Sequence, residues 1–192
     1  METAKKDESN SENQAKAQLD SIREMIAALN CDYERLEELK DERADLVDDL
    51  ESAAGDYRVE QTARHALTRW DEENGEELKA LQDAADCGDS NFPCTSREDA
   101  EQRIQEDPLS IQVRGDWHTP GDEEGKTPAE FEILLCTGGP AVRIIGDLNE
   151  HAEPTRARLQ HQDWFTPWTE LVLDHDDHQI LLAYAHCFYY GE

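Results

Sequence analysis

The sequence predicts an α+β fold: a long antiparallel helical hairpin of coiled-coil type, followed by a small domain with about four antiparallel strands and flanking helices. Two observations lead to this prediction. Apolar residues recur every three or four positions through the first half of the chain, which is typical of amphipathic helices. After Pro108 the period changes to two, and short apolar runs alternate with turns rich in glycine and proline.

The first half predicts a disordered tail and then the hairpin. Residues 1–14 are polar and without periodicity, so they are expected to be disordered. The helical pattern covers 15–86 and is broken at Gly55. Its heptad seam meets two cations, so either the register shifts to Leu39 and Leu46 or the cations lie at the interface; they are Lys40 and Arg43. Because the apolar stripe is narrow, it needs cover from the C-terminal domain or from a second copy, as a homodimer through the hairpin.

The second half predicts a linker and the α+β domain. Residues 87–95 read as a linker by composition. Cys87 and Cys94 lie in it, with a spacing that does not suit a zinc knuckle. A disulfide between them is an alternative, but a reducing cytosol favours incidental thiols. The α+β domain covers 96–192 and begins with a helix for which Ser96 is a natural N-cap.

The charge of the chain restricts its partners. With 18 Lys and Arg against 46 Asp and Glu, the formal net charge is −28. A chain of this charge is repelled by nucleic acid and by anionic membranes, so neither is expected as a direct partner. The excess favours a basic protein partner or a cation, or serves solubility alone.

The stretch Cys31–Glu51 contains ten acidic residues on one predicted helix, and many of them form rows in which successive acids are four residues apart. Each like-charged pair at that spacing costs about 0.2–0.5 kcal/mol, so the pattern does not serve helix stability. The helix presents about one charge per 3 Å of axis, close to the phosphate spacing of about 3.4 Å along one DNA strand. The alternative is a solvated helix face. The candidate partner-binding residues are Glu34, Glu37, Glu38, Asp41, Glu42, Asp45, Asp48, Asp49, Asp71, Glu72, Glu73, Glu76 and Glu77.

The motifs that would indicate catalysis are weak. His175 and His178, with Asp176 between them, have a spacing that could hold a metal, but acids here also suit the first turn of a helix. No enzyme, cofactor or metal is therefore predicted. The tryptophans Trp164 and Trp168 around a Thr-Pro turn are interpreted as a core plug, or alternatively as a protein-binding edge.

Four strings carry a resemblance to a known group of proteins: EDAEQRIQEDPLSIQVRGDWHTPG, EILLCTGGPAVRIIGDLNEH, LQHQDWFTPWTE and CFYYGE. With them the chain resembles uncharacterised acidic proteins of phages and integrative mobile elements of proteobacteria. The resemblance implies a setting and no reaction. Small acidic proteins of such elements resemble, as a class, the anti-restriction and anti-CRISPR proteins that act by mimicking DNA.

Together these features predict a non-enzymatic inhibitor that mimics nucleic acid and blocks a basic DNA- or RNA-binding surface of a host defence complex. The alternative is a coiled-coil adaptor or oligomeric scaffold whose acidity serves only solubility. No apolar run approaches the length of about 20 residues that a membrane span needs, and the N-terminal residues lack the apolar core of a secretory signal. The expected location is the cytoplasm of a bacterial host.

Overall fold

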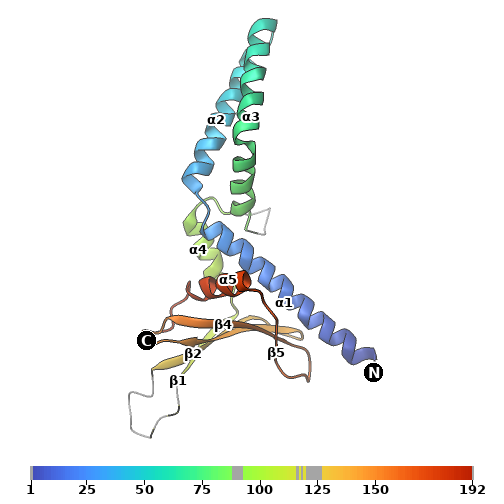
Figure 1. Cartoon of the computed structure of the whole chain (residues 1–192), viewed down its shortest axis with the longest axis vertical. Helices are drawn as coiled ribbons and strands as arrows, with labels where there is room; N and C mark the ends of the chain where they lie inside the picture. The colour runs from blue at the N-terminus through green and yellow to red at the C-terminus, as the bar shows by residue number, and fades with distance from the viewer. Residues whose placement is uncertain (1, 88–92, 116, 118, 120–126, 192) are drawn as a thin grey trace. The chain divides into compact units, whose positions relative to one another are not determined.

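The computed structural model describes residues 2–87, 93–115, 117, 119 and 127–191, with side chains from residue 10 onward. In this part of the chain, four helices precede a five-stranded antiparallel sheet and a final helix, which is an α+β fold (Figure 1). Two compact units form: unit 1 comprises Met1–Ile26 with Ala100–Glu192, and unit 2 comprises Ala27–Asp99. Among the described residues, no helix is long and apolar enough to cross a membrane.

These boundaries differ from the expected tail at 1–14, hairpin at 15–86, linker at 87–95 and domain at 96–192. The helix α1 (Glu2–Leu29) includes the described part of the expected tail. The part of α1 up to Ile26 groups with the sheet, because apolar side chains such as Ile22 are buried in unit 1. Of the expected linker, residues 88–92 lie outside the described part of the chain.

The expected first hairpin helix is two helices, because the chain leaves α1 after Leu29 and starts α2 (Tyr33–Ser52) anew. The Asp32 side chain accepts a hydrogen bond from the Arg35 backbone N–H at 3.0 Å. This bond satisfies one of the amides that a helix start leaves unpaired, so Asp32 acts as the N-cap.

The helix α3 (Tyr57–Ala85) lies beside α2, and the two form the α2–α3 pair (Figure 1). Leu36, Leu39 and Leu78 are buried between them. Each alternative for the seam is met in part: Leu39 is fully buried and Leu46 half-buried, while Lys40 is exposed and Arg43 pairs with Asp71 of α3 at 2.8 Å. The ion pair offsets the cost of a cation at that position.

The sheet of unit 1 has the order β1-β2-β3-β4-β5, with every neighbouring pair antiparallel. The expected four strands are present, and a fifth of two residues pairs with the end of β4. The elements are α4 (Arg97–Glu106), β1 (Ser110–Gly115), β2 (Pro128–Cys136), β3 (Ala141–Leu148), β4 (Pro154–Gln162), β5 (Thr169–Glu170) and α5 (His175–Ala185).

One face of this sheet forms the core. Alternate residues of β2, β3 and β4 are buried, as expected when helices cover one face of an antiparallel sheet; they include Ile133, Ile144 and Leu159. The helix α5 lies on that face (Figure 1) and contributes Leu181 and Tyr184 to the core. The opposite face carries charged and polar side chains such as Glu132, Arg143 and Gln160, together with the half-buried Leu134 and Ile145.

Two polar contacts fix α1 within unit 1. A hydrogen bond of 3.0 Å joins Ser11 Oγ and His161 Nδ1, both buried. Further along the helix, Arg23 Nε donates to Asp177 Oδ1 at 2.9 Å. The hydrogen bond to Asp177, which is buried in α5, and then the charge of Asp177 raise the pKa of the Arg23 guanidinium, so Arg23 stays protonated.

Candidate partner-binding site

The predicted acidic residues of α2 form a stripe along one side of the helix. Steps of three and four residues keep side chains on one face, and the buried Leu36 and Leu39 lie on the opposite face. Five exposed carboxylates separated by such steps are called the acidic stripe here; they are Glu34, Glu37, Asp41, Asp45 and Asp48. The acidic stripe is therefore turned away from the packing surface of the pair.

Some of the predicted acids are paired, mostly across the two helices. Arg35 Nε lies 3.1 Å from Glu77 Oε1, and its Nη1 lies 3.2 Å from Glu38. Trp70 Nε1 of α3 donates to Glu42 of α2 at 3.0 Å. Arg43 pairs with Asp71, as above, and Arg69 lies 3.7 Å from Glu73. These contacts join α2 to α3 and hold the surface in one arrangement.

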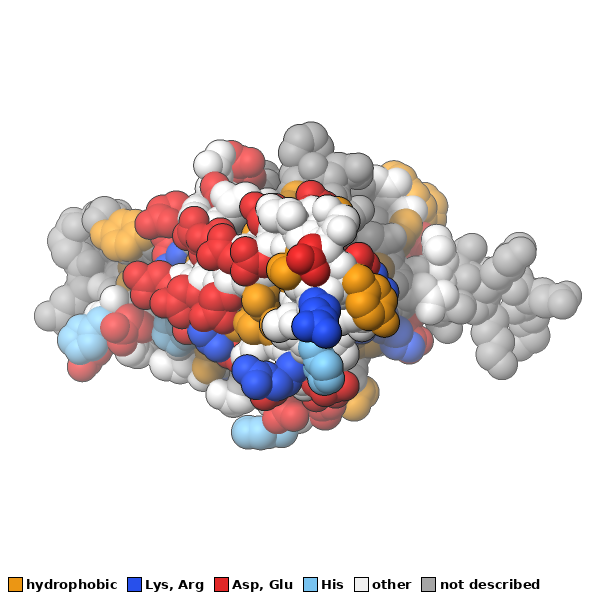
Figure 2. All heavy atoms as spheres, turned by 90° about the horizontal axis from the view of Figure 1, so that it is seen from above, with side chains coloured by type: hydrophobic (Ala, Val, Ile, Leu, Met, Phe, Trp, Pro, Cys, Tyr) orange, Lys and Arg blue, Asp and Glu red, His pale blue; other side chains and the backbone are white. Residues whose placement is uncertain are grey.

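The other predicted acids have no ion pair or hydrogen bond through their side chains to any described residue. They are the five of the acidic stripe together with Asp49, Glu72 and Glu76. All of the predicted partner-binding acids are exposed except Asp71, which is half-buried. Carboxylates gather on one side of the surface that faces the viewer in Figure 2. The structure thus brings the predicted residues onto one helical pair and leaves most of them free.

A hollow of about 960 Å³ adjoins the acidic stripe within unit 2. Three residues of the stripe line it, together with Asp83 and Asp86 at the end of α3. Lys40 is the one basic side chain among the described lining residues, and Leu36 and Pro93 supply apolar surface. Sequence reasoning missed Asp83 and Asp86, although their acidic character near the end of a helix was visible. The hollow suits a cationic side chain with an apolar stem.

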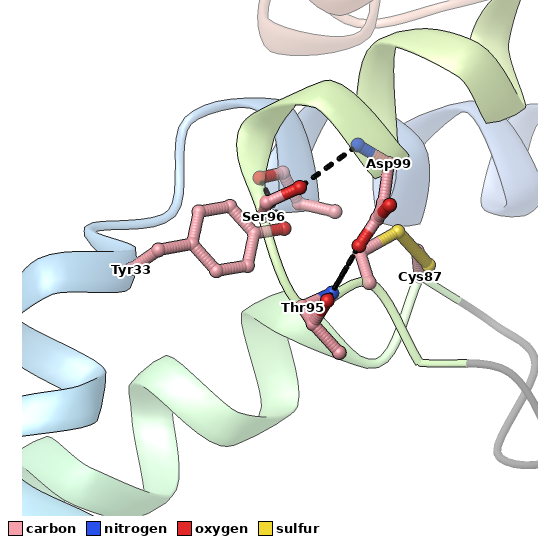
Figure 3. Close-up of a disulfide and its surroundings, with 7 residues drawn as sticks. Tyr33, Cys87, Thr95, Ser96 and Asp99 are labelled. Carbon is pink, nitrogen blue, oxygen red and sulfur yellow. Dashed lines mark hydrogen bonds between the residues drawn. A yellow bond between two sulfur atoms is a disulfide. The ribbon is translucent and has the colours of Figure 1, made fainter.

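A disulfide between Cys87 and Cys94 closes one end of this region (Figure 3). The interpretation of these cysteines as incidental thiols is therefore wrong. The Cys94 backbone N–H donates to the Ala85 carbonyl at 3.0 Å, which returns the chain to the end of α3 and brings the two Cα atoms to 6.5 Å. That return depends on backbone contacts which the spacing of the cysteines does not reveal.

The segment after the disulfide starts α4 through side-chain caps. Ser96 Oγ accepts from the Asp99 backbone N–H at 3.2 Å, as predicted for an N-cap. Asp99 in turn accepts from the hydroxyl and the backbone N–H of Thr95 at 2.6 and 2.9 Å (Figure 3). These bonds lower the pKa of the Asp99 carboxyl, and the bond from the Thr95 hydroxyl has the largest effect. The Asp99 carboxyl therefore stays ionised.

Two groups near the hollow, the Tyr33 hydroxyl and the Cys31 thiol, stay neutral at physiological pH. Burial raises the pKa of Tyr33 to about 12, with smaller effects of the Cys31 and Asp99 charges. Its hydroxyl donates to the Ala28 carbonyl at 3.0 Å. Burial also raises the pKa of the Cys31 thiol, so it is a weak nucleophile.

The two histidines considered as metal ligands lie at the start of α5. Asp174 accepts from the Asp177 backbone N–H at 2.9 Å, so the helix-cap interpretation of this acidic segment is confirmed. His175 is exposed and His178 half-buried. Within the described residues, no group of three or more His, Cys, Asp and Glu side chains could hold a metal ion.

The two tryptophans of the β4–β5 connection differ from each other. Trp168 is half-buried, and the Arg143 guanidinium carbon lies 4.0 Å from its ring centroid. Trp164 is 64% exposed, and its ring fills the space where a side chain on Gly139 would be. Phe165 beside it is fully exposed, which the sequence did not indicate. Neither Trp164 nor Trp168 is the core plug that the aromatic content suggested.

Comparison of the chain with protein-family models, curated proteins and solved structures found no match. The resemblance to acidic proteins of mobile elements therefore stays a prediction. The acidic surface is the basis for the functional argument below.

Proposed function

We propose that the protein is a non-enzymatic inhibitor that mimics nucleic acid and occupies a basic DNA- or RNA-binding surface of another protein. The observation that carries this proposal is the acidic stripe: five exposed carboxylates in one row, without partners among the described residues. In the class to which the chain bears a resemblance, such a target belongs to a host defence complex, of the restriction or CRISPR type.

The charge spacing of α2 supports the proposal. With Glu38, Glu42 and Asp49, which lie beside the acidic stripe, α2 carries eight carboxylates between residues 34 and 49. At about 1.5 Å of rise per residue these span roughly 22 Å, or about one charge every 3 Å. One strand of B-DNA presents a phosphate about every 3.4 Å. A row of Lys and Arg side chains spaced to meet phosphates would therefore meet carboxylates here.

The rigidity of the surface supports it as well. Arg35 and Arg43 bridge α2 to α3, and Leu39 is buried between the helices. The helix that carries the carboxylates is therefore held in position before a partner arrives, which lowers the entropic cost of binding. The hollow beside Glu37 and Asp41 would accept an arginine or lysine that reaches beyond the row.

The test is competition with DNA. Immobilised protein is exposed to bacterial host lysate at about 0.1 M and about 0.5 M salt, and bound proteins are challenged with excess duplex DNA. We expect retention of DNA-binding proteins at low salt, release by duplex DNA, and loss at high salt. The variant Glu37→Gln, Asp41→Asn, Asp45→Asn and Asp48→Asn should lose retention.

A matched control removes the same number of charges elsewhere: Glu24→Gln, Glu98→Gln, Glu106→Gln and Glu150→Gln, all exposed. It should keep retention, because it leaves the acidic stripe intact. Capture that withstands both duplex DNA and the stripe substitutions would exclude mimicry. Salt-insensitive capture would instead favour the adaptor hypothesis, in which apolar contacts hold the partner.

A further inference from the structure

The two edges of the sheet in unit 1 are unlike. At one edge, β5 has only two residues and ends in Glu170. At the other, β1 has six residues, and no described strand pairs with its outer side. An open edge presents unpaired backbone N–H and C=O groups, and proteins usually protect it by short strands, charges or prolines. The edge β5 is protected in this way, whereas β1 has no proline and a single charge, on Arg114.

An uncovered apolar row runs along the same edge. The register of β1 on β2 places Val113 opposite Phe131 and Ile111 opposite Ile133, so these side chains lie on the core face. Phe131 is covered by the ring of Tyr190, at 4.8 Å between centroids. In contrast, the side chains of the β1 edge remain open: Leu109 is 60%, Ile111 38% and Val113 47% exposed.

We propose that β1 pairs with β1 of a second copy of this chain, antiparallel, around a two-fold axis at Gln112. The regular part of the strand is Ser110–Arg114, because the register shifts after Arg114. Gln112 is the centre of that part, so it meets Gln112 of the second copy. The two sheets then form one continuous sheet across the axis.

The side chains of β1 are complementary to themselves in this register. Ile111 of one copy lies opposite Val113 of the other, so each covers the apolar surface that the other leaves open. On the opposite face, Arg114 lies opposite the uncharged Ser110. Arg114 also has an acid of its own, since it pairs with Glu130 of β2. No like charges meet within the strand pair.

Total charge gives this dimer a distinctive salt response. Each copy carries a formal charge of −28, so the copies repel one another at long range. Salt screens that repulsion, while the strand pairing itself depends little on salt. The dimer should therefore strengthen with salt, opposite to the acidic-stripe contact proposed above. The inference goes beyond that proposed function and does not depend on it.

Cysteine cross-linking tests the register. In the variant Gln112→Cys, the two new thiols lie across the strand pair, where opposite Cβ atoms are about 4.5–5.5 Å apart. Under mild oxidation it should form a disulfide-linked dimer. Ser110→Cys alone should not, because the two copies of position 110 are then about 13 Å apart along the strands. A mixture of Ser110→Cys and Arg114→Cys should cross-link.

The parent chain, treated in parallel, accounts for cross-links through the native Cys31, Cys136 and Cys187. Cross-linking of Ser110→Cys alone as fast as Gln112→Cys would overturn the register. So would failure of Gln112→Cys to cross-link above the parent chain.

Sedimentation equilibrium tests the dimer itself. The wild-type chain should be a dimer, and its dissociation constant should decrease when the salt concentration is raised from about 0.1 M to about 0.5 M. Ile111→Lys with Val113→Lys should raise that constant by on the order of tenfold or more, with an unchanged circular dichroism spectrum, because both positions are already partly exposed. Tyr57→Lys with Val59→Lys, at exposed apolar positions of α3, is the control and should leave it unchanged.

A wild-type chain that stays monomeric at every concentration and salt would overturn the proposal and leave the edge for a strand of another protein. A dimer that survives the β1 substitutions but not the α3 substitutions would instead place the contact on the helical pair.

Discussion

Carboxylates on the acidic stripe of α2 and carboxylates on the sheet face opposite the core differ in whether they have partners. On the sheet, Glu132 and Glu130 each pair with an arginine of a neighbouring strand. Arg143, the partner of Glu132, also donates to Gln160 Oε1 at 2.9 Å and covers the ring of Trp168. On α2, the carboxylates of the stripe have no such partner among the described residues.

This difference separates charges that stabilise the fold from charges that do not. The pair of Arg143 and Glu132 is half-buried, so it supports the packing around it, whereas the pair of Arg114 and Glu130 is exposed. The stripe carries a small cost from like-charge contacts, and buried leucines such as Leu39 hold the pair together in spite of it. A binding role would explain why α2 carries a row of carboxylates that lowers its stability.

The largest effect is expected on the sheet. Arg143→Ala should lower the free energy of unfolding by about 2–3 kcal/mol, because it removes hydrogen bonds to Glu132 and Gln160 and the contact with Trp168. Urea unfolding followed by circular dichroism measures this. Arg156→Ala on β4 is the control and should cost less than about 0.5 kcal/mol, since Arg156 is exposed and has no ion pair with a described residue. Equal losses in the two variants would remove the contrast.

A smaller effect of opposite sign is expected on α2. Glu37→Gln with Asp41→Asn and Asp45→Asn removes three like-charge contacts four residues apart. The free energy of unfolding should rise by about 0.5–1.5 kcal/mol in low salt and by less at about 0.5 M salt. The same urea titration at two salt concentrations measures both values. A loss of stability would mean that these acids serve the fold after all.

The smallest effect should be the response of unit 1 to acid. Burial, the largest cause, lowers the pKa of His161 from its ordinary value of 6.5, partly opposed by the Glu12 charge. The folded state thus prefers the neutral ring. Its stabilising contribution is complete above pH 6.5 and is lost as the pH falls through the lower folded-state pKa, because the unfolded chain takes up the proton first.

Hydrogen exchange at pH 7.5 and pH 5 can measure this by comparing β4 with the α2–α3 pair, where His65 is exposed. Protection of β4 should fall more than that of the pair. In the variant His161→Gln the difference between the two regions should shrink; an unchanged difference would assign the acid response to other groups.

The predictions that the structure confirms rest mostly on local sequence signals. The change of period at Pro108 separates helices from strands, and Ser96 and Asp174 cap helices as expected. The break between α1 and α2 was missed, because apolar residues at helical spacing continue through it from Ile26 to Tyr33. The N-cap Asp32 was the one local sign of the break.

Contacts between distant parts of the chain could not be predicted. Arg35 meets Glu77 only because α2 and α3 are packed in one particular register. The same applies to the disulfide of Cys87 and Cys94, which needs the backbone bond from Cys94 to Ala85. Exposure of the stripe, in contrast, follows from helical spacing alone, and this is why the candidate site was largely visible in the sequence.

Trp70 is the one tryptophan in the sequence of unit 2; the other three are Trp117, Trp164 and Trp168. Its indole lies against the core of the pair, and its N–H donates to Glu42, one of the acids of the candidate surface. A carboxylate beside an indole affects the wavelength and the intensity of the fluorescence that the indole emits. The molecule therefore contains a built-in fluorescent reporter at its acidic surface, which can be read alone once the other three tryptophans are replaced by phenylalanine.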